Sequence, residues 1–220
     1  MENKKAIVFD MDGVIFDSEV LVRRCWKETA MEYNVDDMEK VFLECVGVSL
    51  DGAKKIFYKY YGQDFPYYEF REKSRKKFFA IVEKETLPVK KGVRELLKFL
   101  KAENYIIGIA SSNRIKIIKK EITEANLMPY FNTIIGGDLV EKSKPEPDIY
   151  LLACEEMGVD PRYTYVIEDS YNGIKSAHSA NMKAIMVPDI LEPNAEMKVL
   201  SYKICNDLLE VLDDFKCKKL

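Results

Sequence analysis

The sequence predicts an α/β fold: a doubly wound parallel sheet that carries an inserted, all-helical domain. Two observations lead to this prediction. Short β-branched or aromatic runs alternate with helical stretches over most of the chain, and one long stretch, 17–86, shows helical spacing only. Strands that alternate with helices are joined by crossovers and are therefore parallel. With 220 residues the chain is long enough for a core domain and a smaller insert.

Five runs have the pattern of buried strands, because each is short, apolar and rich in β-branched residues. These runs are residues 5–10, 105–110, 133–136, 164–168 and 183–187. Between them the spacing predicts helices over residues 92–103, 113–126, 147–157 and 171–181. The alternation predicts a sheet with helices on both faces.

The stretch 17–86 interrupts this alternation. Apolar residues such as Val20, Leu21 and Cys25 recur at helical spacing, and the stretch is too long for a simple crossover. We therefore expect a phosphoryl-transfer core over 1–16 and 87–220 and a helical cap domain over 17–86. The segment 57–79 holds ten aromatic residues. We expect many of them to pack the core of the insert, and some of them could line a substrate pocket.

Composition excludes several classes of protein. The net charge of -3 gives no basic surplus for nucleic acid, and the apolar runs fall far short of the ~20 residues that a membrane span needs. The five cysteines form no C-x-x-C pair, so we expect reduced thiols in a cytoplasmic protein without a signal peptide. The single histidine, His178, argues against a histidine zinc site or a Ser-His-Asp triad. We also expect a monomer.

Polar residues follow four of the predicted strands. They are Asp10 and Asp12 after the first strand, Ser111, Ser112 and Asn113 after the second, Lys144 beyond the third, and Glu168 and Asp169 at the fourth. A single carboxylate in such a place is often only a helix cap, as we expect for Asp148 and Asp160. Ligands of open α/β sheets bind at the carboxyl ends of the strands, so a convergence at four strand ends predicts a site.

The residue types indicate phosphoryl transfer. Clustered carboxylates repel one another unless a cation neutralises them, and hard oxygen ligands suit Mg²⁺. Asp10 and Asp12 face the same side of an extended segment, so one can attack while the other handles a proton. Lys144 can offset negative charge. Ser111 precedes a predicted helix whose N-terminus favours a phosphate group.

These motifs resemble those of the haloacid dehalogenase superfamily, which consists mostly of phosphatases. The resemblance rests on four stretches, which are DMDGVIFDSE, GIAS, SKPEPDIY and VIEDSYNGI. They occur in the family's order and at the expected strand ends, and the match covers nearly the whole chain. Within the family the sequence is similar to the beta-phosphoglucomutase-like branch, which has a helical cap after the first motif.

The resemblance implies a role for each residue. It implies Asp10 as nucleophile and Asp12 as general acid and base. It implies that Mg²⁺ is held by Asp10, the Asp12 backbone carbonyl and Asp169, with Glu168 as a further candidate ligand. It also implies that Ser111, Asn113 and Lys144 bind the phosphate. We expect Ser112 to bind the phosphate as well. Family members that remove halogens lack the second aspartate, so Asp12 favours phosphoryl transfer. The prediction is a magnesium-dependent phosphatase of a small phosphorylated metabolite, such as a sugar or polyol monophosphate, acting through an aspartyl-phosphate intermediate.

The alternative within the branch is a hexose phosphate mutase. Val22 stands where the mutase has a histidine, and Leu50 stands where an arginine after the stretch Gly47–Ser49 grips a second phosphate. Losing that bidentate anchor favours a phosphatase. Another cation of the cap could replace the arginine, and the candidates are Lys54, Lys55 and Arg71.

Other phosphate-binding classes fit less well. A signalling receiver domain is shorter, lacks a helical insert and carries its aspartate after a middle strand. No cysteine begins a C-x5-R motif. Gly47 and Gly52 have the spacing of a P-loop, but Ala53 and Lys54 follow, and no strand precedes them.

Overall fold

The central strand, β1 (Ala6–Phe9), has every side chain buried, as expected for a strand covered on both faces. In the computed structural model, which describes residues 5–46, 48 and 50–220, β1 pairs with parallel neighbours on both sides. The sheet of the described residues has six strands in the order β3-β2-β1-β4-β5-β6, and each strand is parallel to its neighbours. The predicted doubly wound parallel sheet is confirmed.

The other strands lie close to their predicted positions. They are β2 (Ile106–Ser111), β3 (Thr133–Gly136), β4 (Thr164–Glu168), β5 (Lys183–Met186) and β6 (Lys203–Ile204). The bounds of the five predicted strands differ from the observed ones by no more than one residue at either end. The edge strand β6 was not predicted, because two residues carry too little periodicity to be recognised.

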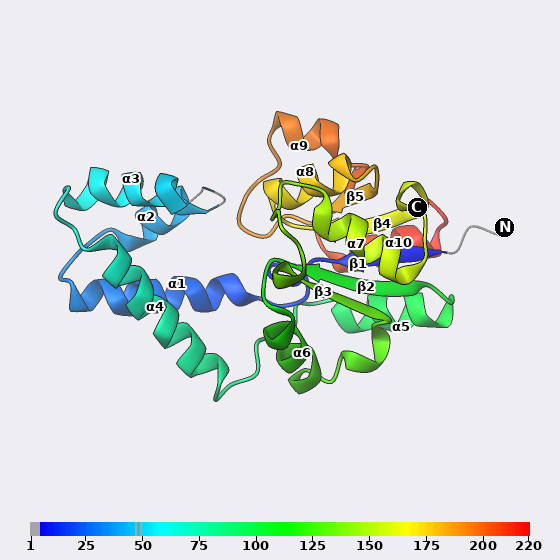
Figure 1. Cartoon of the computed structure of the whole chain (residues 1–220), viewed down its shortest axis with the longest axis horizontal. Helices are drawn as coiled ribbons and strands as arrows, with labels where there is room; N and C mark the ends of the chain where they lie inside the picture. The colour runs from blue at the N-terminus through cyan, green and yellow to red at the C-terminus, as the bar shows by residue number, and fades with distance from the viewer. Residues whose placement is uncertain (1–4, 47, 49) are drawn as a thin grey trace. The chain divides into compact units, whose positions relative to one another are not determined.

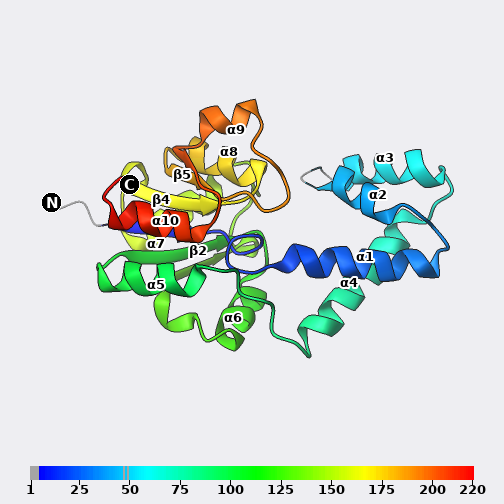
Figure 2. The same cartoon turned by 180° about the vertical axis from the view of Figure 1, so that it is seen from behind.

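Helices cover both faces of the sheet (Figures 1 and 2). They are α5 (Val93–Ala102), α6 (Ile115–Glu124), α7 (Asp148–Met157), α8 (Tyr171–Ser179), α9 (Ala195–Leu200) and α10 (Leu208–Lys216). On one face α7, α8 and α9 bury a core that includes Val8, Ala110 and Val166 of the sheet. On the other face α5 and α10 pack together, with α6 beside β3.

One compact unit comprises Met1–Phe16 and Pro88–Leu220. The regular structure described in the other unit, Asp17–Leu87, is all helical. Its helices are α1 (Ser18–Glu32), α2 (Met38–Cys45), α3 (Leu50–Tyr61) and α4 (Tyr67–Val82). The part of the mutase-like stretch at Gly47 and Ser49, with the start of the P-loop near miss, lies outside the described residues.

Aromatic side chains form the core of this helical unit. Phe57, Phe65, Tyr67 and Phe70 are buried, and the Trp26 ring lies 5.3 Å from that of Phe57. The prediction that many of these aromatics pack the insert is therefore confirmed. Tyr68, by contrast, is 61% exposed and stays available to a ligand.

Within the described ranges, no helix combines the length and the apolar character that crossing a membrane requires.

Candidate functional site

The strand ends bring the predicted residues of the core unit together. Asp10 extends β1, and its N–H donates to Ile167 of β4 at 3.0 Å. Ser111 is the last residue of β2, and Glu168 is the last residue of β4. Both are buried, with 1% and 0% of their surfaces exposed. Parallel strands thus place a nucleophile candidate, a hydroxyl group and a carboxylate at one edge of the sheet.

Lys144 connects these strand ends. Its Nζ donates to Asp10 Oδ1 at 2.5 Å, to Glu168 Oε1 at 2.6 Å and to the Ala110 carbonyl at 3.2 Å. The peptide bond between Lys144 and Pro145 is cis. Burial alone would lower the pKa of Lys144, but the charges of Asp10 and Glu168 hold it well above its usual value. The lysine is therefore a permanent positive charge at the centre of the cluster.

Glu168 is held on both carboxylate oxygens. Oε1 also accepts from the Tyr150 hydroxyl at 2.8 Å, and Oε2 accepts from the N–H groups of Asp169 and Ser170 at 3.1 Å. A Cβ at Gly173 would lie only 1.8 Å from the carboxyl carbon of Glu168. Position 173 must therefore be glycine for Glu168 to occupy this place.

Negative charge is concentrated at this edge. One ligand oxygen from each of Asp10, Glu168 and Asp169 lies within 4.8 Å of the others. Burial raises the pKa of Asp10 to about 8, with Lys144 opposing and Glu168 adding to the rise. Burial and the charge of Glu168 also hold the pKa of Asp169 well above its usual range. A hard divalent cation would relieve this repulsion, so the donor set fits Mg²⁺.

The turn after β1 requires glycine. Gly13 has φ +76°, and a Cβ there would lie 2.3 Å from Asp169 Oδ2. This close approach lets the segment that carries Asp10 and Asp12 pack directly against Asp169. The Asp12 carboxylate accepts from Asn113 Nδ2 at 2.7 Å, which orients the predicted general acid.

The residues after β2 form a turn at the same edge. Ser111 Oγ accepts from the Asn113 N–H at 3.1 Å, whereas Ser112 is exposed. Helix α6 begins at Ile115, two residues after Asn113, and its N-cap residue Arg114 makes no side-chain cap. The structure therefore brings Asp10, Asp12, Ser111, Asn113, Lys144, Glu168 and Asp169 to one edge, with Ser112 beside them.

Two residues of this edge were missed from the sequence. Asp189 follows β5, and its charge helps to raise the pKa of Asp169, whose largest cause is burial. Lys90 Nζ lies 2.5 Å from Asp189 Oδ1. Asp189 lies just after the fifth predicted strand, 183–187, so the rule that ligands bind at strand ends could have identified it. Tyr150, which binds Glu168, had no comparable signal, because its position on α7 depends on how the helix packs.

A second group of metal-ligating side chains is less suited to a cation. Cys205, Glu210 and Asp214 lie together near the end of the chain. Hydrogen bonding to Lys203 lowers the pKa of Asp214, so a lysine already balances its charge. Burial raises the pKa of the Cys205 thiol to about 12, which keeps it protonated. The arrangement is a partly buried ion pair that joins β6 to α10.

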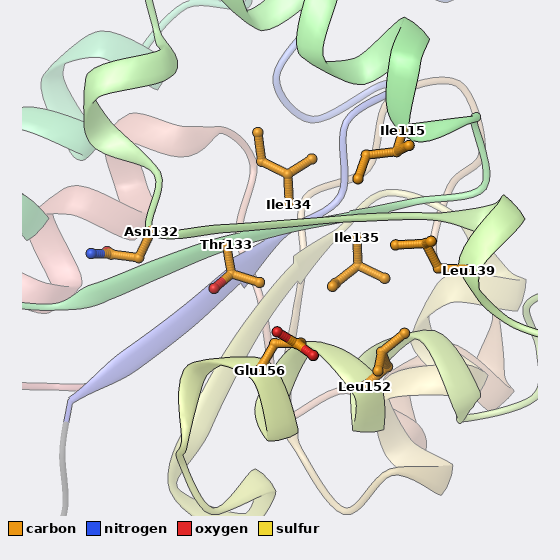
Figure 3. Close-up of a pocket in the computed structure, with 8 residues that line it drawn as sticks. All are labelled: Ile115, Asn132, Thr133, Ile134, Ile135, Leu139, Leu152 and Glu156. Carbon is orange, nitrogen blue, oxygen red and sulfur yellow. The ribbon is translucent and has the colours of Figure 1, made fainter.

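A cavity of about 510 Å³ lies at the free edge of the sheet, beside β3 (Figure 3). Ile134, Ile135, Leu139 and Leu152 line it. The residues that line this cavity include no member of the carboxylate cluster.

His178 is exposed, and its Nδ1 lies 3.3 Å from the Leu200 carbonyl, so it joins α8 to the end of α9.

Comparison with known proteins gives the family. Residues 7–187 match haloacid dehalogenase-like hydrolases. Hexitol phosphatase B of Escherichia coli (strain K12) is 30% identical over 217 residues, which cover 98% of this chain and 92% of that protein. Beta-phosphoglucomutase of Bacillus subtilis (strain 168) is 30% identical over 192 residues, 83% of each protein.

A solved structure supports the fold. Beta-phosphoglucomutase from Clostridium difficile matches with a TM-score of 0.74 at 23% identity, over 98% of this chain and 96% of that one. The family match spans most of the chain, and the first and fourth motifs lie inside it. The chain therefore belongs to the haloacid dehalogenase-like hydrolase family.

Proposed function

We propose that this protein is a magnesium-dependent phosphatase of a small phosphorylated metabolite and that Asp10 is its phosphoryl acceptor. The observation that carries the proposal is the position of Lys144, which is bonded to Asp10 and Glu168 at 2.5 and 2.6 Å. A buried lysine between two carboxylates suits a site where a phosphoryl group meets an anionic nucleophile. The prediction of a phosphoric monoester hydrolase agrees with a relative named hexitol phosphatase.

The carboxylates of Asp10 and Asp169 and the backbone carbonyl of Asp12 would hold Mg²⁺. Glu168 is the weaker candidate for a direct ligand, because its oxygens already accept bonds from Lys144, Tyr150 and backbone N–H groups. When bound, Mg²⁺ would supply positive charge that lets the anionic phosphate approach Asp10.

The chain's own residues then carry two steps. A carboxylate oxygen of Asp10 forms a bond to phosphorus while the bond to the leaving oxygen breaks, and Asp12 gives that oxygen a proton. Asp12 next takes a proton from water, whose oxygen attacks phosphorus and releases inorganic phosphate from Asp10. Asn113 holds Asp12 in place through both steps, and Lys144 balances the charge that develops on the phosphoryl group.

Phosphate release from a panel of sugar and polyol phosphates tests this function. The wild-type protein with Mg²⁺ should release phosphate from at least one of them, and a chelator should abolish the release. An acid quench during turnover should leave a phosphoryl group on the peptide that contains Asp10. A phosphoryl group on another residue, or full turnover in excess chelator, would contradict the mechanism.

The second candidate function is a hexose phosphate mutase, which the Bacillus relative's name favours. A mutase must hold a bisphosphate with a cation far from the nucleophile. Leu50, the first residue of α3, supplies no such cation. Lys54, one turn later, lies 4.8 Å from the centre of the Tyr68 ring and is the replacement that we favour testing.

Glucose 1-phosphate with a trace of glucose 1,6-bisphosphate separates the two functions. A phosphatase should release inorganic phosphate and free sugar with no need for the bisphosphate. Rapid formation of glucose 6-phosphate with little free phosphate would instead make the protein a mutase. In that case the Lys54→Ala variant should form much less glucose 6-phosphate, whereas the exposed Lys76→Ala control should form it at the wild-type rate.

A further inference from the structure

The turn after β3 holds the turn after β2 in place. Asp138 Oδ1 accepts from the N–H of Ile115, the first residue of α6, at 2.8 Å. Next to it, the Gly137 N–H donates to the Asn113 carbonyl at 2.8 Å. Figure 3 shows Ile115 and Leu139, the neighbour of Asp138, at the carboxyl end of β3. Two segments that are distant in the sequence are thus joined by two hydrogen bonds, one at Asn113 and one at Ile115.

The fit between the two turns leaves no room for larger residues. A Cβ at Gly136 would lie 2.4 Å from the Ile115 nitrogen, and a Cβ at Gly137 would lie 2.5 Å from the Ser112 carbonyl oxygen. Gly136 has φ -102°, which any residue adopts, so glycine is needed there for space. Close packing of this kind means that a displacement of one turn must displace the other.

These contacts lead directly to the chemistry. Asn113 is bonded on three sides: its N–H donates to Ser111 Oγ, its carbonyl accepts from Gly137, and its side chain donates to Asp12. Among these contacts, the Asp138 carboxylate is the side chain that links the turn after β3 to the segment after β2. Because Arg114 provides no side-chain cap, Asp138 also supplies the acceptor for the first N–H of α6.

We propose that Asp138 is a positioning residue, which sets the place of Asn113 and Ser111 and, through Asn113, the orientation of Asp12. This inference rests on the proposed phosphatase function for its catalytic consequence. Asp138 is exposed and takes no part in the chemistry itself. Displacements of about 1 Å in positioning groups can lower rates by about 10²-fold, so loss of one of two bonds should cost about tenfold.

Three variants test the proposal with Mg²⁺ and p-nitrophenyl phosphate. Asp138→Ala removes the acceptor and should lower kcat/KM about tenfold, whereas Asp138→Asn keeps an acceptor oxygen and should retain most of the activity. Asp160→Ala is the matched control. Asp160 Oδ1 accepts the Arg162 N–H at 2.9 Å, before the amino end of β4 and away from the carboxyl ends of the strands. Loss of this bond should lower Tm by an amount comparable with Asp138→Ala and leave kcat/KM unchanged.

Hydrogen exchange tests the same contact without any substrate. The peptide that covers 112–118 should exchange faster in Asp138→Ala than in wild type, and Asp138→Asn and Asp160→Ala should exchange at the wild-type rate. If Asp138→Ala leaves both this exchange and the turnover unchanged, the positioning role is wrong. If no variant, wild type included, hydrolyses a phosphate ester, the proposed function fails while the exchange result still decides the positioning role.

Discussion

The two compact units bury different kinds of side chain. Four carboxylate residues are buried among the described residues, and all four belong to the core unit: Asp10, Glu121, Glu168 and Asp214. The helical unit buries aromatic rings around Phe57 and leaves its ion pairs exposed, such as Lys59 with Glu44. Buried charge is costly unless it is paired. Asp214 is paired with Lys203 and joins β6 to α10, whereas Asp10 and Glu168 share Lys144 at the proposed site. The two units therefore differ in what stabilises them: buried carboxylates paired with lysine occur in the core unit, and the helical unit is packed around aromatic rings.

Replacing the nucleophile should produce the largest effect. Asp10→Asn keeps the shape of the side chain but removes the attacking oxygen, so turnover should fall by about 10⁴-fold or more. Stability should stay equal or rise, because a buried carboxyl group with a raised pKa is replaced by a neutral amide. Phosphate release and urea unfolding measure the two effects. The control Asp64→Asn, in the helical unit, should change neither.

A substitution in the aromatic core of the helical unit should chiefly lower stability, whereas Asp10→Asn should chiefly lower turnover. Phe57 is fully buried, and its ring centre lies 5.1 Å from those of Tyr67 and Phe70. Phe57→Ala should reduce the free energy of unfolding of the helical unit by about 3–4 kcal/mol. Phe79→Ala, at a ring that is 36% exposed, should cost much less. Urea unfolding measures both changes. Equal losses of unfolding free energy in the two variants would contradict an aromatic core centred on Phe57.

A third substitution tests how tightly the site itself is packed. Gly173→Ala would gain about 1 kcal/mol of helix propensity on α8 but would push Glu168 out of place. The net result should be a loss of about 2 kcal/mol, together with slower turnover. In the helical unit, a Cβ at Gly62 meets nothing within 4 Å, so Gly62→Ala should cost only the strain of its positive φ, about 1 kcal/mol. A stabilised Gly173→Ala variant would show that Glu168 is not held as described.

The smallest effect concerns pH. The pKa of Asp10 rises from 3.8 to about 8 on folding, so between these values the cation-free folded protein holds a proton that the unfolded chain has released. Its contribution to stability is therefore present at low pH and is lost as the pH rises toward 8. If Asp10 holds Mg²⁺ as proposed, the ion displaces this proton, and the stabilisation by Mg²⁺ should grow with pH by about 1 kcal/mol per unit or less. Thermal melting with and without Mg²⁺ from pH 5 to 8 measures this. The Asp10→Asn variant has no carboxyl proton to release, so its stabilisation by Mg²⁺ should not grow with pH in this way. A wild-type stabilisation by Mg²⁺ that is independent of pH would contradict the prediction.

Sequence reasoning predicted which residues of the candidate site lie together, because they follow short apolar runs rich in β-branched residues. Asp10, Ser111 and Glu168 lie directly at strand ends, and parallel strands place such residues together. The requirement for Gly13 next to Asp169 could not be predicted, since it depends on how closely two turns approach. The same is true of Tyr150 and Asp138, whose contacts arise from the packing of α7 and of the turn after β3.

The helical unit was less readable in detail. Its apolar spacing predicted helices and an aromatic core, but not which rings stay exposed. Tyr67 is buried and its neighbour Tyr68 is exposed, although both are tyrosines at the start of α4. Which side faces inward depends on the rotation of the helix against α1 and α3, and periodicity alone does not set that rotation.

The order of the strands has a consequence for how the protein is made. Ala6 of β1 pairs with Ile106 on one side and with Thr164 on the other, so β1 must wait for partners that are translated much later. The helical unit, whose contacts are local in sequence, has everything it needs by Leu87. A nascent chain arrested before β4 could therefore carry a folded helical unit and still have no second neighbour for the strand that ends in Asp10. The proposed site, which needs both Asp10 and Glu168, can therefore form only after β4 has been translated.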